Sequence, residues 1–134
     1  MKLLRQERDD PGPTGEARAP HTDAADPHPR RALVCVACRN RITSEAARIE
    51  VAGEHRHVCV NPSGVPFDIA CFDLAPGCVP HGRREGYWSW FAGYDWQIAL
   101  CGTCRAHLGW SFHGDGTFYG LIASRLAPEE GPEP

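Results

Sequence analysis

Short stretches of alternating or β-branched residues follow one another from about residue 31 to residue 127, and turn residues separate them. Alternation over four to eight residues is typical of half-buried strands, and none of the stretches keeps the 3.6-residue period of a helix. The pattern therefore predicts an all-β domain of short antiparallel strands. The predicted strand stretches are 48–51, 55–60, 65–72, 83–91, 94–100, 107–112 and 117–126.

The turns between these stretches have recognisable chemistry. Residues 61–64 read Asn-Pro-Ser-Gly, in which Pro presets φ and Gly accepts a positive φ. Residues 113–116 read His-Gly-Asp-Gly and predict a hairpin turn. Residues 73–82 contain two Pro and two Gly and are predicted to form a loop.

Composition defines the expected domain boundaries. The chain has 134 residues, 42% of them hydrophobic, which is enough for one domain. Residues 1–30 contain almost no large apolar residue after Leu4, and 128–134 read PEEGPEP. Such segments bury too little apolar surface to fold, so we expect disordered tails at 1–30 and 128–134 around a domain at 31–127.

The sequence also bears on localisation and membrane association. The sequence has no apolar run long enough to span a bilayer, and its first twenty residues lack the apolar core of a signal peptide. We therefore expect a cytoplasmic protein without a membrane partner.

Four of the seven cysteines form two Cys-x-x-Cys pairs, Cys35 with Cys38 and Cys101 with Cys104. In a reducing compartment such pairs indicate metal ligation rather than disulfides. Four thiolates leave no open position for water, so the pattern predicts one structural Zn²⁺ per chain, with iron as the less favoured ion. Because residues 39–100 separate the pairs, the metal would join the two ends of the domain.

The other three cysteines are expected to be ordinary thiols. Cys59 stands between two valines and Cys71 lies in an apolar stretch, so both are expected to be buried. Cys78 lies in the predicted loop and is expected to be exposed.

All four tryptophans lie between Trp88 and Trp110, close to the second cysteine pair. Tryptophans usually fill a core, but their density beside turns and a metal knuckle also fits a pocket wall. The residues alone leave both interpretations open.

Five motifs in order are similar to those of the CULT family, the family of the thalidomide-binding domain of cereblon. They are NPSG at 61–64, WFAGYDW at 90–96, CGTC at 101–104, HLGWSF at 107–112 and FYGL at 118–121. The resemblance covers most of residues 31–127. The chain is similar to the free-standing bacterial modules of the family. It implies a β-tent, two antiparallel sheets pinned at one end by zinc, and a non-enzymatic ligand-binding module.

The resemblance also implies a ligand site. Its cage would be Trp90, Trp96 and Trp110 with Phe112 as the fourth wall, and Asn61 and Pro62 would form a turn over it. Backbone groups around Trp88 and Trp90 would pair with the ligand. The implied ligands are cyclic imides of the glutarimide or thalidomide type, uridine-like rings, and cyclised imides at protein C-termini.

Two positions depart from the family pattern. Trp88 stands where animal cereblon has His, so one side-chain hydrogen bond to an imide is expected to be missing. Ala92 stands where the family usually has Pro, which is expected to leave the loop less rigid.

Three other functions would each explain part of the sequence. A methionine-sulfoxide reductase can carry two such cysteine pairs, but it needs a later nucleophilic Cys, and none follows Cys104. Three indoles suit a quaternary ammonium ion, for which only Asp95 offers a nearby acid. A nucleic-acid module would need a basic groove, which the formal net charge of −3 does not favour.

Overall fold

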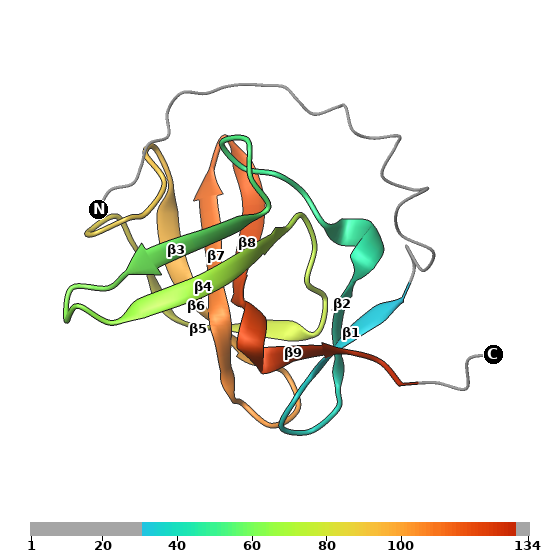
Figure 1. Cartoon of the computed structure of the whole chain (residues 1–134). Helices are drawn as coiled ribbons and strands as arrows, with labels where there is room; N and C mark the ends of the chain where they lie inside the picture. Colours follow the sequence, from blue (N-terminus) through green and yellow to red (C-terminus); the bar gives the residue numbers. More distant parts are fainter. Residues whose placement is uncertain (1–30, 131–134) are drawn as a thin grey trace.

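The computed structural model describes residues 31–130, and within them nine strands form two sheets that contain only antiparallel pairs (Figure 1). The predicted all-β class with two antiparallel sheets is confirmed. The expected tail at 1–30 and the last four residues of the expected C-terminal tail lie outside the described residues.

The smaller sheet has the order β2-β1-β9 and joins the two ends of the domain. Its strands are β1 (Ala32–Cys35), β2 (Arg41–Ser44) and β9 (Leu126–Pro128).

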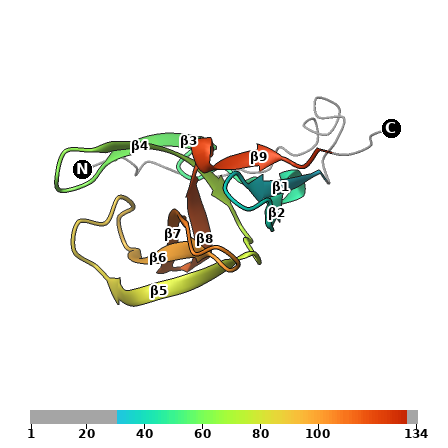
Figure 2. The same ribbon diagram turned by 90° about the horizontal axis from the view of Figure 1, so that it is seen from below.

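The larger sheet has the order β3-β4-β8-β7-β6-β5, so β3 and β5 are its edges. Figure 2 shows that it curls, which brings β3 and β4 to the side opposite β5 and β6. Its strands are β3 (Arg56–Val60), β4 (Pro66–Phe72), β5 (Cys78–Glu85), β6 (Asp95–Cys101), β7 (His107–Gly114) and β8 (Gly116–Ile122).

Two buried clusters fill the domain. One contains residues of both sheets, among them Leu33, Ile42, Leu108 and Leu121. The other is aromatic and lies along the curled sheet. The central strand β7 is buried on both faces from Leu108 to Phe112, which explains its near-continuous apolar run. The aromatic cluster consists of Cys59, Ile69, Cys71, Trp90, Phe91, Trp110, Phe112, Phe118 and Ile122.

Two single-turn 3₁₀ helices, η2 (Glu45–Ala47) and η3 (Ala123–Arg125), connect strands. Across residues 31–130 no helix has the length and apolar character needed to cross a bilayer.

The predictions for residues 73–91 are partly wrong. The loop expected at 73–82 ends early, because β5 begins at Cys78 and includes Pro80. Proline is tolerated here since β5 is an edge strand, where a missing N–H need not interrupt pairing. The strand expected at 83–91 also ends early, at Glu85, and residues 86–94 form a loop, called the cage loop below.

The boundary expected at residue 128 lies too early in the chain. Pro128 pairs with Leu33 in the smaller sheet, and the backbone N–H of Glu129 donates to the carbonyl of Ala32 at 2.8 Å. The Glu129 carboxylate also accepts two hydrogen bonds from Arg41, at 2.8 and 3.0 Å. The Pro- and Glu-rich composition of 128–134 did not predict a strand here. The strand forms because it pairs with β1, which is distant in the sequence.

Candidate metal centre and aromatic pocket

The first cysteine pair lies in the tight turn between β1 and β2. The N–H of Cys35 donates to the carbonyl of Asn40 at 2.8 Å, and the N–H of Arg39 donates to the carbonyl of Cys35 at 2.7 Å. Arg39 has φ 69°, a left-handed conformation that lets the chain reverse right after Cys38.

The second pair repeats this geometry between β6 and β7. The N–H of Cys101 donates to the carbonyl of Ala106 at 2.8 Å, and that of Arg105 donates to the carbonyl of Cys101 at 2.9 Å. Arg105 has φ 68°, nearly equal to that of Arg39. Two equivalent turns, one from each sheet, therefore present two thiols each.

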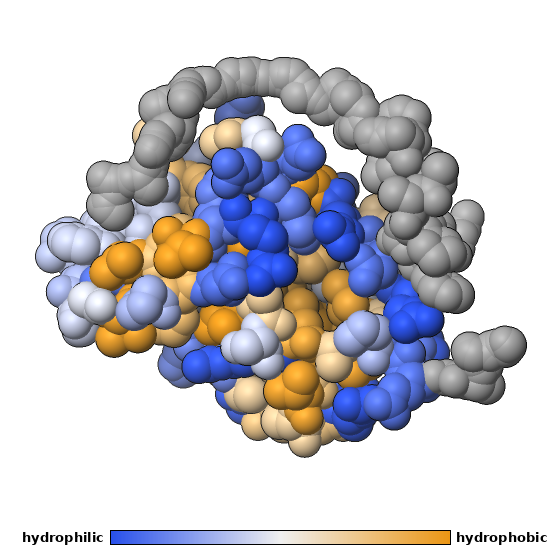
Figure 3. All heavy atoms as spheres, viewed as in Figure 1, coloured by the Kyte–Doolittle hydropathy of each residue, from blue (hydrophilic) through white to orange (hydrophobic). Residues whose placement is uncertain are grey.

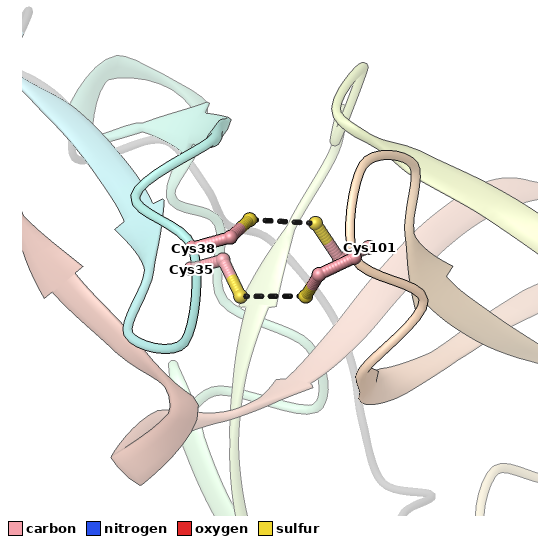
Figure 4. A group of neighbouring side chains, drawn as sticks. Cys35, Cys38 and Cys101 are labelled. Carbon is pink, nitrogen blue, oxygen red and sulfur yellow. Dashed lines mark hydrogen bonds between the residues drawn. The ribbon is translucent and has the colours of Figure 1, made fainter.

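The four sulfur atoms converge on one point (Figure 4). Cys35 Sγ lies 3.7 Å from Cys104 Sγ, Cys38 Sγ lies 3.6 Å from Cys101 Sγ, and all four sulfurs are within 4.8 Å of one another. Disulfide sulfurs would be about 2.05 Å apart, whereas tetrahedral Zn–S bonds of about 2.3 Å place sulfurs roughly 3.8 Å apart. The four predicted ligands form a candidate metal site with the spacing of a tetrahedral cage.

Hydrogen bonds within the cage favour thiolate character at Cys101. Burial opposes ionisation of this thiol, but backbone bonds at Cys104 and Thr103 and side-chain bonds from Cys38 and Asn40 lower its pKa to about 6. The N–H of Thr103 and Nδ2 of Asn40 lie 3.4 and 3.6 Å from Cys101 Sγ. At Cys38 a backbone bond at Asn40 acts to lower the pKa, but desolvation and the neighbouring thiols outweigh it and raise the pKa to about 12. Such a cage holds several thiolates together only when a cation offsets their repulsion.

The remaining cysteines lie elsewhere in the fold. Cys59 and Cys71 are buried as expected, and desolvation raises the pKa of both, that of Cys59 to about 12. Cys78 was expected to be exposed, which is wrong: it lies in β5 opposite Cys101 and packs against the core.

All seven residues predicted to bind ligand line one cavity with a volume of about 370 Å³. Trp96 lies on β6, and Trp110 and Phe112 lie two residues apart on β7, so their side chains share one face of the sheet. Trp88 and Trp90 come from the cage loop. The lining residues are Asn61, Pro62, Phe67, Trp88, Trp90, Trp96, Ile98, His107, Trp110 and Phe112.

The predicted turn at 61–64 is held by the side chain of Asn61. Its Oδ1 accepts the N–H groups of Ser63 and Val65, both at 2.9 Å, and Gly64 has φ 84°. This places Asn61 and Pro62 at the end of β3, on the wall of the cavity.

The sequence left open whether the tryptophans fill the core or form a pocket wall, and the tryptophans differ in this respect. Trp90 and Trp110 are only 6% and 8% exposed, and their rings meet edge-to-face with centroids 4.7 Å apart, so they belong to the core and to the cavity wall. Trp96 packs against that cluster and is partly exposed. Trp88 is 42% exposed and lies outside the cluster.

Three of the four indole N–H groups hydrogen-bond to the backbone. Nε1 of Trp88 and Nε1 of Trp90 each donate to the carbonyl of Val60 at 2.9 Å. Nε1 of Trp96 donates to the carbonyl of Tyr87 at 2.6 Å. These bonds tie the cage loop to the end of β3 and to β6.

Sequence reasoning missed three lining residues. Phe67 on β4 contacts Trp110 edge-to-face at a centroid distance of 5.2 Å, and His107 does so at 4.9 Å. Ile98 pairs with Trp110 across β6 and β7. Alternation could have placed Ile98 on the face of Trp96, but Phe67 reaches the cavity only because the sheet curls.

Hydrophobic side chains also lie on the surface outside the cavity, near the turn at 61–64. Val58 and Val60 on β3 and Val65 in the following turn are 70%, 40% and 45% exposed, and Figure 3 shows hydrophobic residues over this part of the molecule. Tyr87, 70% exposed, stands next to Trp88 with ring centroids 6.2 Å apart.

Comparisons with known proteins identify relatives for part of the chain. No protein-family model matches it. Cereblon from Danio rerio is 38% identical over 85 residues, which cover 55% of this chain and 20% of that protein. Cereblon from Gallus gallus is 36% identical over 75 residues, or 52% of this chain and 17% of that protein.

A further relative extends the comparison to insects. Cereblon from Drosophila melanogaster is 46% identical over 51 residues, or 34% of this chain and 9% of that protein. The chain thus spans about a fifth or less of the length of these relatives. Over about half of its own length it is homologous to cereblon, and it contains a cereblon-like domain.

Proposed function

We propose that this domain is a small-molecule binding module whose aromatic pocket binds cyclic imides of the glutarimide type. The observation that carries the proposal is the convergence of seven residues, from positions 61 to 112, on one cavity of about 370 Å³. Ligand pockets are typically roughly 300–1,000 Å³, so this one suits a small ring. Homology to cereblon supports a binding domain rather than a catalytic enzyme.

The chemistry of the wall matches that of an imide ring. Indole and phenyl faces would cover the methylene groups and exclude water. Backbone groups of the cage loop around Trp88 and Trp90 would pair with the acceptor–donor–acceptor edge of the imide, where low local polarity strengthens each bond. Uridine-like rings present a similar edge, as does a cyclised imide at a protein C-terminus, so both are included in the proposed ligand class.

The character of the lining disfavours the alternatives. Among the described residues that line the cavity none is acidic, as a quaternary ammonium reader would require, and none is Arg or Lys, as a nucleic-acid groove would. Asp95, the acid considered for a cation site, is not part of the lining. Cys59, Cys71 and Cys78 do not line it either, which leaves a reductase without a nucleophile in the pocket.

We further propose that the four-cysteine site holds a structural Zn²⁺. The ion would supply four bonds that fasten the β1–β2 turn of one sheet to the β6–β7 turn of the other, without an open position for chemistry.

The test of the imide proposal is a calorimetric titration with glutarimide, N-methylglutarimide, uridine and tetramethylammonium. Glutarimide is expected to bind and its N-methyl form to fail, because methylation removes the ring's only donor and leaves a backbone carbonyl unpaired. Equal binding of the two imides, or of neither, would refute the proposal. Binding of tetramethylammonium alone would establish the cation reader instead.

A further inference from the structure

The cage loop is an irregular segment that carries part of the cavity wall. It spans residues 86–94, and its own backbone bonds are sparse, with the N–H of Tyr94 donating to the carbonyl of Phe91 at 3.1 Å. Gly93 has φ 85°, and Ala92 is exposed. A loop of this kind needs contacts with its neighbours to keep one conformation.

The carbonyl of Val60 provides such a contact by accepting two hydrogen bonds from the loop. It belongs to the last residue of β3, an edge strand, and it accepts both indole N–H groups of Trp88 and Trp90 at 2.9 Å. A carbonyl has two lone pairs, so the two donors saturate it. An edge carbonyl that would otherwise face solvent is therefore an anchor for the loop.

The backbone at Trp88 is in an unfavourable conformation. Its φ is 58°, which is rare for a bulky residue and is maintained only where the surroundings hold it. The side chain makes few packing contacts, since it is 42% exposed and lies outside the core clusters. The bond to Val60 is the interaction that retains it, together with the ring contact to Tyr87.

A third bond fixes the same stretch from the other side. Trp96 on β6 donates its indole N–H to the carbonyl of Tyr87 at 2.6 Å. The segment 87–90 is thus held between the end of β3 and the start of β6, which lie on opposite sides of the curled sheet (Figure 2).

We infer that Trp88 is a positioning residue: its indole N–H fastens the cage loop to the carbonyl of Val60 and keeps the cavity formed before any ligand arrives. Its donor is therefore committed to the protein and is not offered to the ligand. Trp88 acts through Trp90, which shares the same acceptor and forms the cavity wall. The statement that the Trp88 donor is not offered to the ligand rests on the proposed imide function. The statement that Trp88 holds the cage loop in place does not.

The test compares Trp88→Phe, which keeps an aromatic ring but removes the donor, with Tyr87→Phe, a matched change on the neighbouring exposed ring. Hydrogen exchange followed by NMR reports on the indole N–H of Trp90 and the amide of Tyr94 in the ligand-free protein. Losing one hydrogen bond is expected to speed exchange at both sites about fivefold in Trp88→Phe. Tyr87→Phe should leave exchange at both sites unchanged. The urea midpoint of Trp88→Phe should fall only slightly, because the lost bond also contributes to the free energy of global unfolding.

Two results would overturn the inference. One is unchanged exchange at Trp90 and Tyr94 in Trp88→Phe. The other is an equal acceleration in Tyr87→Phe, which would mean that the effect does not depend on the indole donor of Trp88. Adding glutarimide to the wild type separates the two proposals: if it neither binds nor slows exchange in the loop, the imide function fails, and the ligand-free comparison still decides the role of Trp88.

Discussion

Trp96 and Trp110 line the same cavity, but the core depends on them to different degrees. Trp110 is 8% exposed within the aromatic cluster, whereas Trp96 only packs against its outside. Trp110→Ala is expected to lower the free energy of unfolding by about 3–5 kcal/mol. Trp96→Ala should lower it less, yet weaken imide binding by about 2 kcal/mol as the loss of an aromatic anchor.

Urea unfolding and calorimetry on each variant check this pair, with Tyr87→Phe, which keeps the exposed ring, as the control. Equal stability losses in both tryptophan variants, without a change in affinity for Trp96→Ala, would mean that Trp96 is a core residue only.

Cys101 and Cys78 lie opposite each other on β6 and β5, but only Cys101 is part of the sulfur cage. Cys101→Ser is expected to abolish metal retention and unfold the domain, because a structural four-cysteine site contributes on the order of 10 kcal/mol. Cys78→Ser should keep one zinc per chain. Elemental analysis and circular dichroism of both variants give the answer, and metal-free but folded Cys101→Ser would contradict the prediction.

At the residue scale, the sequence predicted which residues form the two sites better than it predicted their burial and packing. The cysteine spacing identified the four clustered thiols without help from the fold. The family motifs identified seven residues that line one cavity, but not that Trp90 and Trp110 are also core residues. Phe67 was missed because its approach to Trp110 depends on the curvature of six paired strands, which no local pattern encodes.

At the scale of elements, β9 shows how much a three-residue strand can contribute. It supplies the second neighbour of β1, with Val34 paired to Ala127 and Leu33 to Pro128. Ending the chain after Leu126 is expected to lower the free energy of unfolding by about 2 kcal/mol, since two or three backbone hydrogen bonds are lost and β1 becomes an edge.

The matched control is Glu129→Gln, which weakens only the ion pair with Arg41. Arg41 is 72% exposed in its side chain, so this change should alter stability by less than about 1 kcal/mol. Urea titration of both proteins separates strand pairing from charge. Because the shortened chain also lacks Glu129, an equal loss of stability in the two proteins would assign the stabilisation to the ion pair.

Alternation predicted several strands but failed at residues 48–51, which were expected to form a strand and make only isolated bridges at Arg48 and Val51. Elements defined by distant partners were not predictable. The stretches that became β3, β4, β7 and β8 carry their pattern locally. β5 contains Pro80 and Gly82, so its composition resembles a loop, and it is a strand only because β6 pairs with it. Trp88 and Trp90, which were expected within a strand at 83–91, instead lie in a loop from which both indoles reach Val60.

For the molecule as a whole, the partly buried His55 predicts how stability responds to acid. Desolvation is the main cause that lowers the pKa of His55, and the neighbouring Arg48 and Arg56 add to it against the bond to Ile49. Below its ordinary pKa of 6.5, the unfolded chain therefore binds more protons than the folded one. Stability should be complete above about pH 6.5 and fall as the pH drops from there toward the folded pKa.

Urea titrations between about pH 7.5 and 5.5 measure this slope, with bound metal monitored at each pH because acid also protonates thiolates. His55→Asn places an amide donor near the position of Nδ1, which bonds to the carbonyl of Ile49, but cannot titrate, so its slope should be smaller than that of the wild type. Identical slopes in the two proteins would show that His55 does not contribute.

The pairing of the first strand with the last has a further consequence. Because the N–H of Glu129 bonds to the carbonyl of Ala32, the chain enters and leaves the domain at neighbouring points, as the positions of β1 and β9 in Figure 1 show. A module with adjoining ends can be inserted into a surface loop of a host protein without forcing apart the flanking host segments. It should also tolerate circular permutation, since a short linker could join its ends while a new opening is made at an exposed turn outside the cavity wall, such as 52–54.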